Sequence, residues 1–343
     1  MLDLQLLVDS ADSAALLRAI DGLCASRQWD ALSDLARRCR RAMDVGKQLW
    51  PIAMHIDYRL ALQGPPSHAA AVLEPGAARF ALGPLTEVAA SNHDWAGIAP
   101  HIRDPASAAA VAQERVIRGE DLRDVVDGLI SELPLRLAHW EPNYALPHYR
   151  DREAAFPQPE AAAKSLGTAL IRRMEPSSSL DEDRGAQALR DLVETWVTQS
   201  AGRARAVTVE GDAEGALGRL LADTGREPAA AIVALEPADA LAILQWAGAS
   251  GGAYGRRRGG ARGRFATWWA AAALAGLDWP VEPDVLGEAI GELLWYRWAL
   301  SGPEPGWALR LAVTDPVDEM GWAIEATDQR TDDPTSGPSG KFR

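Results

Sequence analysis

Residues 307–314, Trp-Ala-Leu-Arg-Leu-Ala-Val-Thr, contain the pattern that decides the fold class of this chain. Large apolar side chains alternate with small or polar ones, which is the period-two pattern of a half-buried β-strand. Residues 321–327, Gly-Trp-Ala-Ile-Glu-Ala-Thr, follow after a short loop that contains Asp315 and Pro316. We predict that the two segments pair as an antiparallel hairpin, with the large apolar face of the first strand buried.

The region before this hairpin mixes helical and strand patterns. Residues 206–210 alternate and are β-branched, so they predict a strand. The apolar run 230–235 fits a buried strand and the start of a helix equally well. Helices are expected at about 184–200, 213–223, 237–249, 262–277 and 284–300. We therefore predict an α+β domain over 184–328, in which helices pack on a small sheet that ends in the hairpin, and a disordered polar tail over 329–343.

The first half of the chain is mainly α-helical. Amphipathic patterns predict three helices over 11–64 and shorter ones as far as about 118. Residues 27–32 resemble residues 93–98, and each segment places a tryptophan after a polar turn. This echo is compatible with an irregular helical bundle or with a short HEAT-like array.

An α-helical domain is accordingly expected over 1–175. It includes a loop rich in proline and aromatic residues at 133–159, followed by a helix at about 160–174. The polar stretch near 176–183 is the expected domain boundary and the expected site of proteolysis.

Composition restricts the function classes. The 343 residues have a formal net charge of −13, which disfavours bulk binding to nucleic acid. The longest apolar run, 266–277, is shorter than the roughly 20 residues of a membrane-spanning helix. Cys24 and Cys39 lie on apolar helix faces, and neither has metal-ligand spacing or requires a disulfide. We therefore expect a cytoplasmic protein without a membrane span, and the sequence implies no metal and no cofactor.

The densest local motif is residues 251–264, which we call the Arg/Gly segment. It holds five arginines and six glycines on an acidic protein. Glycine lets backbone N–H groups approach a ligand, and arginine binds phosphate or carboxylate groups in a bidentate manner. Arginine at a helix start is also the wrong sign for the helix dipole unless a negative group lies there. We predict an anion- or partner-binding site made of Tyr254, Arg256, Arg257, Arg258, Arg262 and Arg264; a solvated loop is the alternative.

A second cluster lies in the loop rich in proline and aromatic residues. Its polar members are His139, Glu141, Tyr144 and His148. Such groups can supply general acid–base chemistry, but the same loop needs polar partners for its own backbone and apolar residues to hold it in place. The structural interpretation is preferred, and the tryptophans of the C-terminal helices are likewise expected to be core.

Common catalytic motifs are missing from the sequence. It contains no GxxxxGK[ST], GxGxxG, HExxH, GxSxG or EF-hand pattern. The preferred hypothesis is a non-enzymatic interaction or scaffold protein whose Arg/Gly segment accepts an acidic partner protein or a small anion. The alternative is an enzyme that acts on a phosphorylated or nucleotide-like substrate and uses the same segment as an anion cradle.

Several of these motifs together resemble a family of uncharacterised proteins from GC-rich bacteria. They are the Arg/Gly run with the following Trp268-Trp269, the earlier Trp140-Glu141-Pro142, and the hairpin sequences around Asp315-Pro316 and Trp322. The resemblance covers about residues 110–330. It implies no activity, cofactor or catalytic residue.

Overall fold

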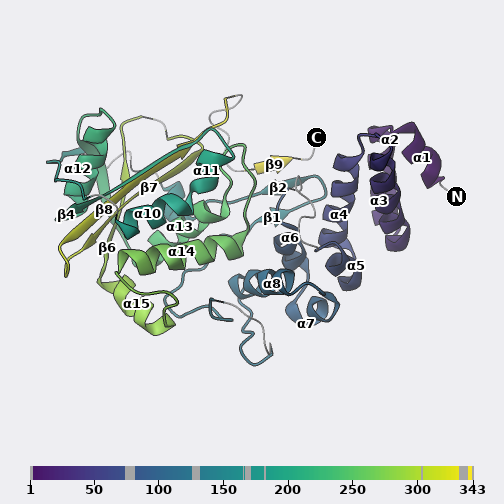
Figure 1. The fold of residues 1–343 in the computed structure, drawn as a ribbon, viewed down its shortest axis with the longest axis horizontal. Coiled ribbons are helices and arrows are strands. Elements are labelled where there is room, and N and C mark those ends of the chain that lie inside the picture. Colours follow the sequence, from purple (N-terminus) through teal and green to yellow (C-terminus); the bar gives the residue numbers. More distant parts are fainter. Residues whose placement is uncertain are drawn as a thin grey trace. The chain divides into compact units, whose positions relative to one another are not determined.

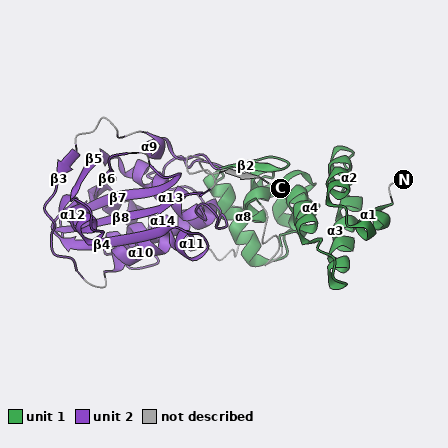
Figure 2. Ribbon diagram, turned by 90° about the horizontal axis from the view of Figure 1, so that it is seen from above, with its two compact units in different colours: residues 1–131, 147–155, 340–343 green, residues 132–146, 156–339 purple. Residues whose placement is uncertain are grey.

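The computed structural model of the chain forms two compact units. It describes residues 3–73, 82–125, 132–164, 166, 171–180, 183–302, 304–331 and 339–341. Unit 1 comprises Met1–Ser131, Pro147–Ala155 and Gly340–Arg343; unit 2 comprises Glu132–Leu146 and Phe156–Ser339 (Figure 2). The chain therefore enters unit 2 at residue 132 and returns to unit 1 for 147–155.

This division differs from the boundary expected near 176–183. The polar stretch lies inside unit 2, where Ser179 forms a β-bridge with Val209. The Leu180 N–H donates a 2.8 Å hydrogen bond to the Thr208 carbonyl. Although residues 175–180 are largely exposed, backbone pairing holds them along the edge of a sheet.

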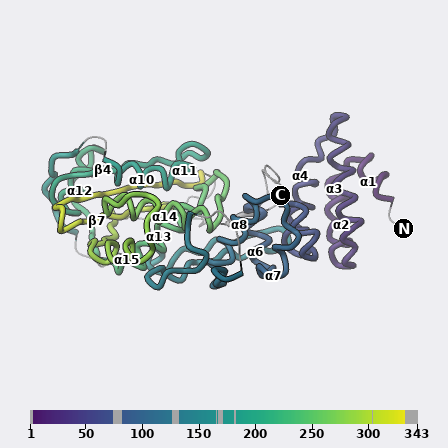
Figure 3. The backbone as a smooth tube through the Cα atoms, turned by 60° about the horizontal axis from the view of Figure 1, so that its bottom comes forward, coloured from purple at the N-terminus to yellow at the C-terminus, as the bar shows by residue number. Residues whose placement is uncertain are grey.

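Unit 1 begins with successive helices, as expected. The helices are α1 (Leu4–Ser10), α2 (Ser13–Ala25), α3 (Trp29–Asp44), α4 (Trp50–Gln63), α5 (Pro66–Ala71), α6 (Leu85–Asn92), α7 (Trp95–Ile98), the 3₁₀ turn η1 (Ala99–His101) and α8 (Pro105–Ile117). Helices α2, α3 and α4 pack on one another, and α6 packs on α4 and α8 (Figure 3). The two tryptophans of the sequence echo, Trp29 and Trp95, each occupy the first position of a helix.

Two apolar clusters form the core of unit 1. One contains the inner faces of α1 to α4, including both cysteines, which are buried free thiols. The other joins the second half of α4 to α5, α6 and α8. A hairpin of β1 (His148–Tyr149) and β2 (Glu153–Ala155) belongs to the same unit, and β9 (Ser339–Lys341) is the third strand of that sheet.

Unit 2 is built on a six-stranded antiparallel sheet in the order β3-β5-β6-β7-β8-β4, whose strands are all labelled in Figure 2; Figure 1 shows β4, β6, β7 and β8 from another side. The strands are β3 (Ile171–Arg173), β4 (Arg203–Glu210), β5 (Ala229–Leu235), β6 (Leu294–Ala299), β7 (Trp307–Asp315) and β8 (Met320–Asp328). The predicted hairpin is confirmed, because β7 and β8 pair along their whole length with Leu311 opposite Ile324.

Helices cover both faces of this sheet. They are α9 (Glu160–Ala163), α10 (Arg184–Leu192), α11 (Glu194–Thr198), α12 (Ala213–Asp223), α13 (Pro237–Ala249), α14 (Gly260–Leu274) and α15 (Pro283–Glu292). Trp307, Leu309, Leu311 and Val313 are buried, as predicted, in a cluster with α10, α13 and α14. The opposite face of the sheet packs on α12. The expected class, mainly α with a C-terminal α+β part, is therefore confirmed.

Several expected elements need correction. The helix expected over 284–300 ends at Glu292, and 294–299 form β6, because pairing with β5 and β7 overrides an ambiguous apolar pattern. Residues 230–235 are a strand, and 160–174 contain only the short helix α9 and the strand β3, with 165 and 167–170 outside the described residues. The tail expected to be disordered over 329–343 makes hydrogen bonds at 329–331 and forms β9; 332–338 and 342–343 lie outside the described residues. No helix among the described residues is both long and apolar enough to cross a membrane.

Candidate functional site

The Arg/Gly segment connects α13 to α14 and folds tightly on itself. A Cβ atom on Gly251 would lie 2.2 Å from the Arg256 carbonyl oxygen, and one on Gly255 would lie 2.0 Å from the Gly251 carbonyl oxygen. Gly252 and Gly259 have φ angles of +79° and +99°, which residues with a Cβ rarely adopt. These glycines therefore allow the chain to approach itself.

The rest of unit 2 holds this turn by its backbone. The buried Asp328 carboxylate accepts a 2.6 Å hydrogen bond from the Ala253 N–H. The Ser200 hydroxyl accepts one of 2.9 Å from the Tyr254 N–H. The Tyr254 ring is 51% exposed, and its hydroxyl lies 2.9 Å from the Thr331 Oγ1. Hydrogen bonds from the backbone of the segment to Asp328 and Ser200 therefore hold it in one conformation at the surface.

Four of the five arginines lie at or near the surface. Arg256 and Arg262 are exposed, whereas Arg257 and Arg258 are half-buried. The Arg257 guanidinium lies 4.6 Å from the centre of the Phe156 ring. Arg258 donates a 3.3 Å hydrogen bond to the Leu192 carbonyl. Burial and then the like charge of Arg262 lower the pKa of Arg258 below its ordinary value.

The fifth arginine, Arg264, differs from the other four because its side chain is completely buried. Its side chain is 0% exposed, and it pairs with the equally buried Glu141 carboxylate at 2.6 Å and 2.7 Å. The remaining guanidinium N–H groups reach the backbone carbonyls of Pro134 and Arg136, each at 3.0 Å. Arg264 is therefore unavailable to an external ligand, which removes it from the predicted binding set.

Glu141 is the centre of a satisfied polar network. Besides Arg264, its carboxylate accepts hydrogen bonds from Trp268 Nε1 at 3.0 Å, the Tyr144 hydroxyl at 2.7 Å and the Ala138 N–H at 2.9 Å. Burial raises the pKa of this carboxyl. The Arg264 hydrogen bonds and charge, together with the hydrogen bonds from Ala138 and Trp268, lower it by more, so the pKa lies below its ordinary value. Burial, and then the Glu141 charge, raises the pKa of Tyr144 well above its ordinary value. The arrangement holds a carboxylate ionised and fixed, which suits a structural clasp.

The structure therefore separates the second predicted cluster. Glu141 and Tyr144 lie together in the clasp. His139 is exposed, and no contact joins its side chain to the clasp within the described residues. His148 is exposed on β1, in unit 1. The four residues do not form one acid–base site.

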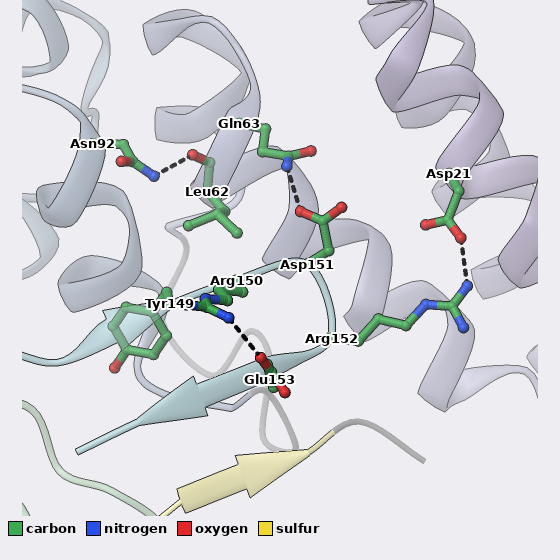
Figure 4. A pocket seen from close by; sticks show the side chains of 9 residues that line it. All are labelled: Asp21, Leu62, Gln63, Asn92, Tyr149, Arg150, Asp151, Arg152 and Glu153. Carbon is green, nitrogen blue, oxygen red and sulfur yellow. Dashed lines mark hydrogen bonds and ion pairs between the residues drawn. The ribbon is translucent and has the colours of Figure 1, made fainter. Parts of the chain in front are cut away.

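A polar pocket in unit 1 escaped the sequence analysis. It has a volume of roughly 700 Å³ and lies between helices α2, α4 and α6 and the β1–β2 hairpin (Figure 4). Its lining residues are Asp21, Leu62, Gln63, Asn92, Tyr149, Arg150, Asp151, Arg152 and Glu153. The one available sequence signal was the alternation of charge over 150–153.

The charges of this pocket pair with one another. Arg152 pairs with Asp21, Arg150 with Glu153 at 3.2 Å, and the Gln63 amide donates to Asp151 at 2.6 Å. Burial raises the pKa of Asp21, but hydrogen bonds from Arg59 and Arg152 leave it below its ordinary value.

Beside the pocket lies a second buried arginine, Arg59. Its side chain is 3% exposed and reaches Asp21 at 2.7 Å and Asp151 at 3.1 Å. Like Arg264, it fixes a loop by pairing with a carboxylate of that loop.

The sequence of the whole chain is similar to one described family. The model of a family described as a family of unknown function (DUF6183) matches residues 14–330. The chain belongs to this family. No curated protein and no solved structure matches the chain.

Membership of an uncharacterised family is thus confirmed, and the DUF6183 match begins well before the span of about 110–330 given by the resemblance. The matched span includes the Arg/Gly segment, both buried arginines and the polar pocket. In the described part of this DUF6183 chain, no group of three or more His, Cys, Asp or Glu residues is placed to hold a metal ion. Against the acidic balance of the whole chain, the Arg/Gly segment contains five arginines and no acidic residue.

Proposed function

We propose that this DUF6183 protein is a cytoplasmic, non-enzymatic interaction protein whose Arg/Gly segment accepts an acidic group of another protein or a small anion. The observation that carries the proposal is the local charge. No acidic residue occurs between Asp239 and Asp278, and all five arginines of the segment lie in this interval. Two of them, Arg256 and Arg262, are exposed.

Electrostatics support a negatively charged ligand at this surface. The first turn of α14 contains no acidic residue, so the positive end of the helix dipole adds to the arginine charge. The Arg262 side chain forms no hydrogen bond or ion pair with any residue that the structure describes. Burial, and then the like charge of Arg262, lowers the pKa of Arg258, so part of this shift reflects the cost of bringing the two positive charges together. An anion would offset that cost, since guanidinium groups bind carboxylate and phosphate strongly.

The cytoplasmic location is part of the proposal. Cys24 and Cys39 are both buried free thiols, and a reducing compartment preserves them in that form.

A thermal-shift titration tests the proposal. The wild-type chain is titrated with inorganic phosphate, with ATP and with polyglutamate, because a ligand of the folded state must raise its stability by mass action. The test variant is Arg256→Gln with Arg262→Gln. The matched control is Arg172→Gln with Arg173→Gln, which removes the same charge from two exposed arginines on β3 of the same unit.

We expect polyglutamate or phosphate to stabilise the wild type and the control but not the test variant. An equal shift in all three chains, or no shift with any anion, contradicts the proposal. A shift confined to ATP would favour the alternative, an enzyme acting on a nucleotide-like substrate.

A further inference from the structure

The exposed face of α14 continues the Arg/Gly segment as an aromatic stripe. Arg262, Phe265 and Trp269 follow one another at intervals of three and four residues, so they lie on one face of the helix. Arg262 is exposed, and both aromatic side chains are half-buried. The basic surface and the aromatic surface therefore meet along about 10 Å of helix, at 1.5 Å per residue.

The stripe extends beyond the helix. The Trp279 ring lies 5.4 Å from Phe265 and 5.6 Å from Trp269, in both cases edge to face. The Arg184 guanidinium lies 5.3 Å from the Trp269 ring, and its ion pair with Asp278 is long, at 4.0 Å. Arg184 thus covers the indole while remaining 42% exposed, an arrangement that a ligand can displace or extend.

Next to this indole is a hollow of roughly 380 Å³ in unit 2. Trp269 of α14 forms one wall, and α10 with its N-cap forms the other, through Asp183, Arg184, Gln187, Ala188, Arg190 and Asp191. Two of its carboxylates are already used: Asp183 accepts the Trp322 indole N–H at 2.8 Å, and Asp191 accepts the Gln187 amide at 2.6 Å. The walls of the hollow are polar apart from Trp269 and Ala188, so the apolar contact surface here is the Trp269 indole at its edge.

We infer that the partner of this surface is an acidic, amphipathic peptide segment of another protein. This inference rests on the proposed function and names its ligand class. Acidic residues of the segment would face Arg262 and Arg256, and an adjacent aromatic or aliphatic side chain would lie on Phe265 and Trp269. Charge complementarity sets the order along the surface, because the first turn of α14 carries Arg262 and no acidic residue, whereas Asp278 beside Arg184 makes the far end mixed. Aromatic residues and arginine are the residue types that contribute most to protein interfaces.

Three synthetic peptides test the inference on the full-length chain by fluorescence anisotropy. The first joins a run of Glu to a run of Leu, Trp and Phe. The second replaces the apolar residues with Ser, and the third replaces Glu with Lys. We expect the first to bind about tenfold or more tightly than the second, since burying one large apolar side chain contributes that much. The third should not bind.

Variants assign the effect to residues. Phe265→Ser should remove the preference for the first peptide and leave the affinity for the second unchanged. Arg262→Gln should weaken both acidic peptides. The matched control is Leu294→Ser, which replaces an exposed apolar residue of β6, outside the stripe, and should change nothing. If Phe265→Ser lowers the melting temperature, Arg184→Gln is a second variant that alters the surface around Trp269. It should change the affinity for the first peptide alone.

The outcomes separate the two proposals. If the two acidic peptides bind equally well and both depend on Arg256 and Arg262, the inference fails and the proposed function stands. If neither acidic peptide binds the wild type, both fail. Equal binding of the Lys peptide overturns the inference, because the surface would then select apolar residues without regard to charge.

Discussion

Replacing Glu141 by Gln should destabilise unit 2 strongly. The carboxylate accepts five hydrogen bonds, two of them from Arg264, and both side chains are completely buried. Glutamine keeps the shape but offers one acceptor oxygen, and its amide N–H groups face donors. It also leaves the Arg264 charge without a counter-ion. Removing one partner of a buried ion pair costs about 3–5 kcal/mol, a large fraction of the roughly 5–15 kcal/mol that stabilises a typical domain.

The assay is urea denaturation followed by tryptophan fluorescence. All but three of the 13 tryptophans lie in unit 2, so the signal reports this unit. The matched control is Glu214→Gln, which breaks the exposed Arg172–Glu214 pair of the same unit. Exposed pairs are worth about 1 kcal/mol or less. A loss in Glu141→Gln no larger than that of the control would refute the reasoning.

A second variant separates buried charge from lost packing. Glu141→Gln combined with Arg264→Met removes the unpaired charge, so the double variant should be more stable than Glu141→Gln alone. If it is less stable, the contacts of the arginine stem and its bonds to Pro134 and Arg136 contribute more than the charge does.

The direction in which the stability contributed by Glu141 changes with pH follows from its pKa. The pKa of Glu141 is lower in the folded state than its ordinary value of 4.5. The stability that this carboxyl contributes is therefore fully present above pH 4.5 and is lost as the pH falls through the lower folded pKa. The difference between wild type and Glu141→Gln should shrink in that acidic range.

Three further predictions concern other parts of the chain. Gly263→Ala should destabilise unit 2 by about 2 kcal/mol or more in the urea assay, because the new Cβ would lie 2.4 Å from the Gln245 carbonyl oxygen; Gly22→Ala, with nothing within 4 Å, should be neutral or stabilising by up to about 1 kcal/mol. Burial lowers the pKa of His55 to about 4 from 6.5, so unit 1 should lose up to roughly 3 kcal/mol as the pH falls between these values, and a pH series of melting curves on His55→Phe should lack that loss. Limited proteolysis should cut first within 175–180, which is largely exposed; if mass spectrometry places the first cut in a helix of unit 2 instead, the backbone pairing along β4 protects the segment fully.

Local patterns predicted the parts of the fold that depend on local physics. The β7–β8 hairpin followed from the alternation over 307–314, whose large apolar face had to be buried, and from the short loop that leads to its partner segment. The prediction of a helix over residues 294–299 was wrong because no such local pattern marks them as a strand. Leu-Trp-Tyr-Arg-Trp-Ala carries no clear period of two, and its strand conformation comes from pairing with β5 and β7, which the sequence around it does not encode.

The candidate site shows a similar division. The Arg/Gly segment was recognised from its composition, and its exposed cations Arg256 and Arg262 lie at the surface. The burial of Arg264 was not foreseen, since its partner Glu141 is 123 residues earlier in the chain. Both residues had been singled out, but in separate clusters, and spacing alone does not pair residues at that distance.

The buried residues Arg264 and Arg59 explain how a loop rich in proline becomes a fixed structure. Prolines prevent regular hydrogen bonding over much of 133–159, so its backbone carbonyls and turns need other partners. Arg264 supplies them within unit 2, where it binds two loop carbonyls and Glu141. Within unit 1, Arg59 does the same for the hairpin tip through Asp151. Because a buried guanidinium without its carboxylate is costly, each clasp also specifies which residues of the loop belong to which unit. Of the polar residues that most resembled a catalytic centre, Glu141 and Tyr144 are therefore used to hold the loop.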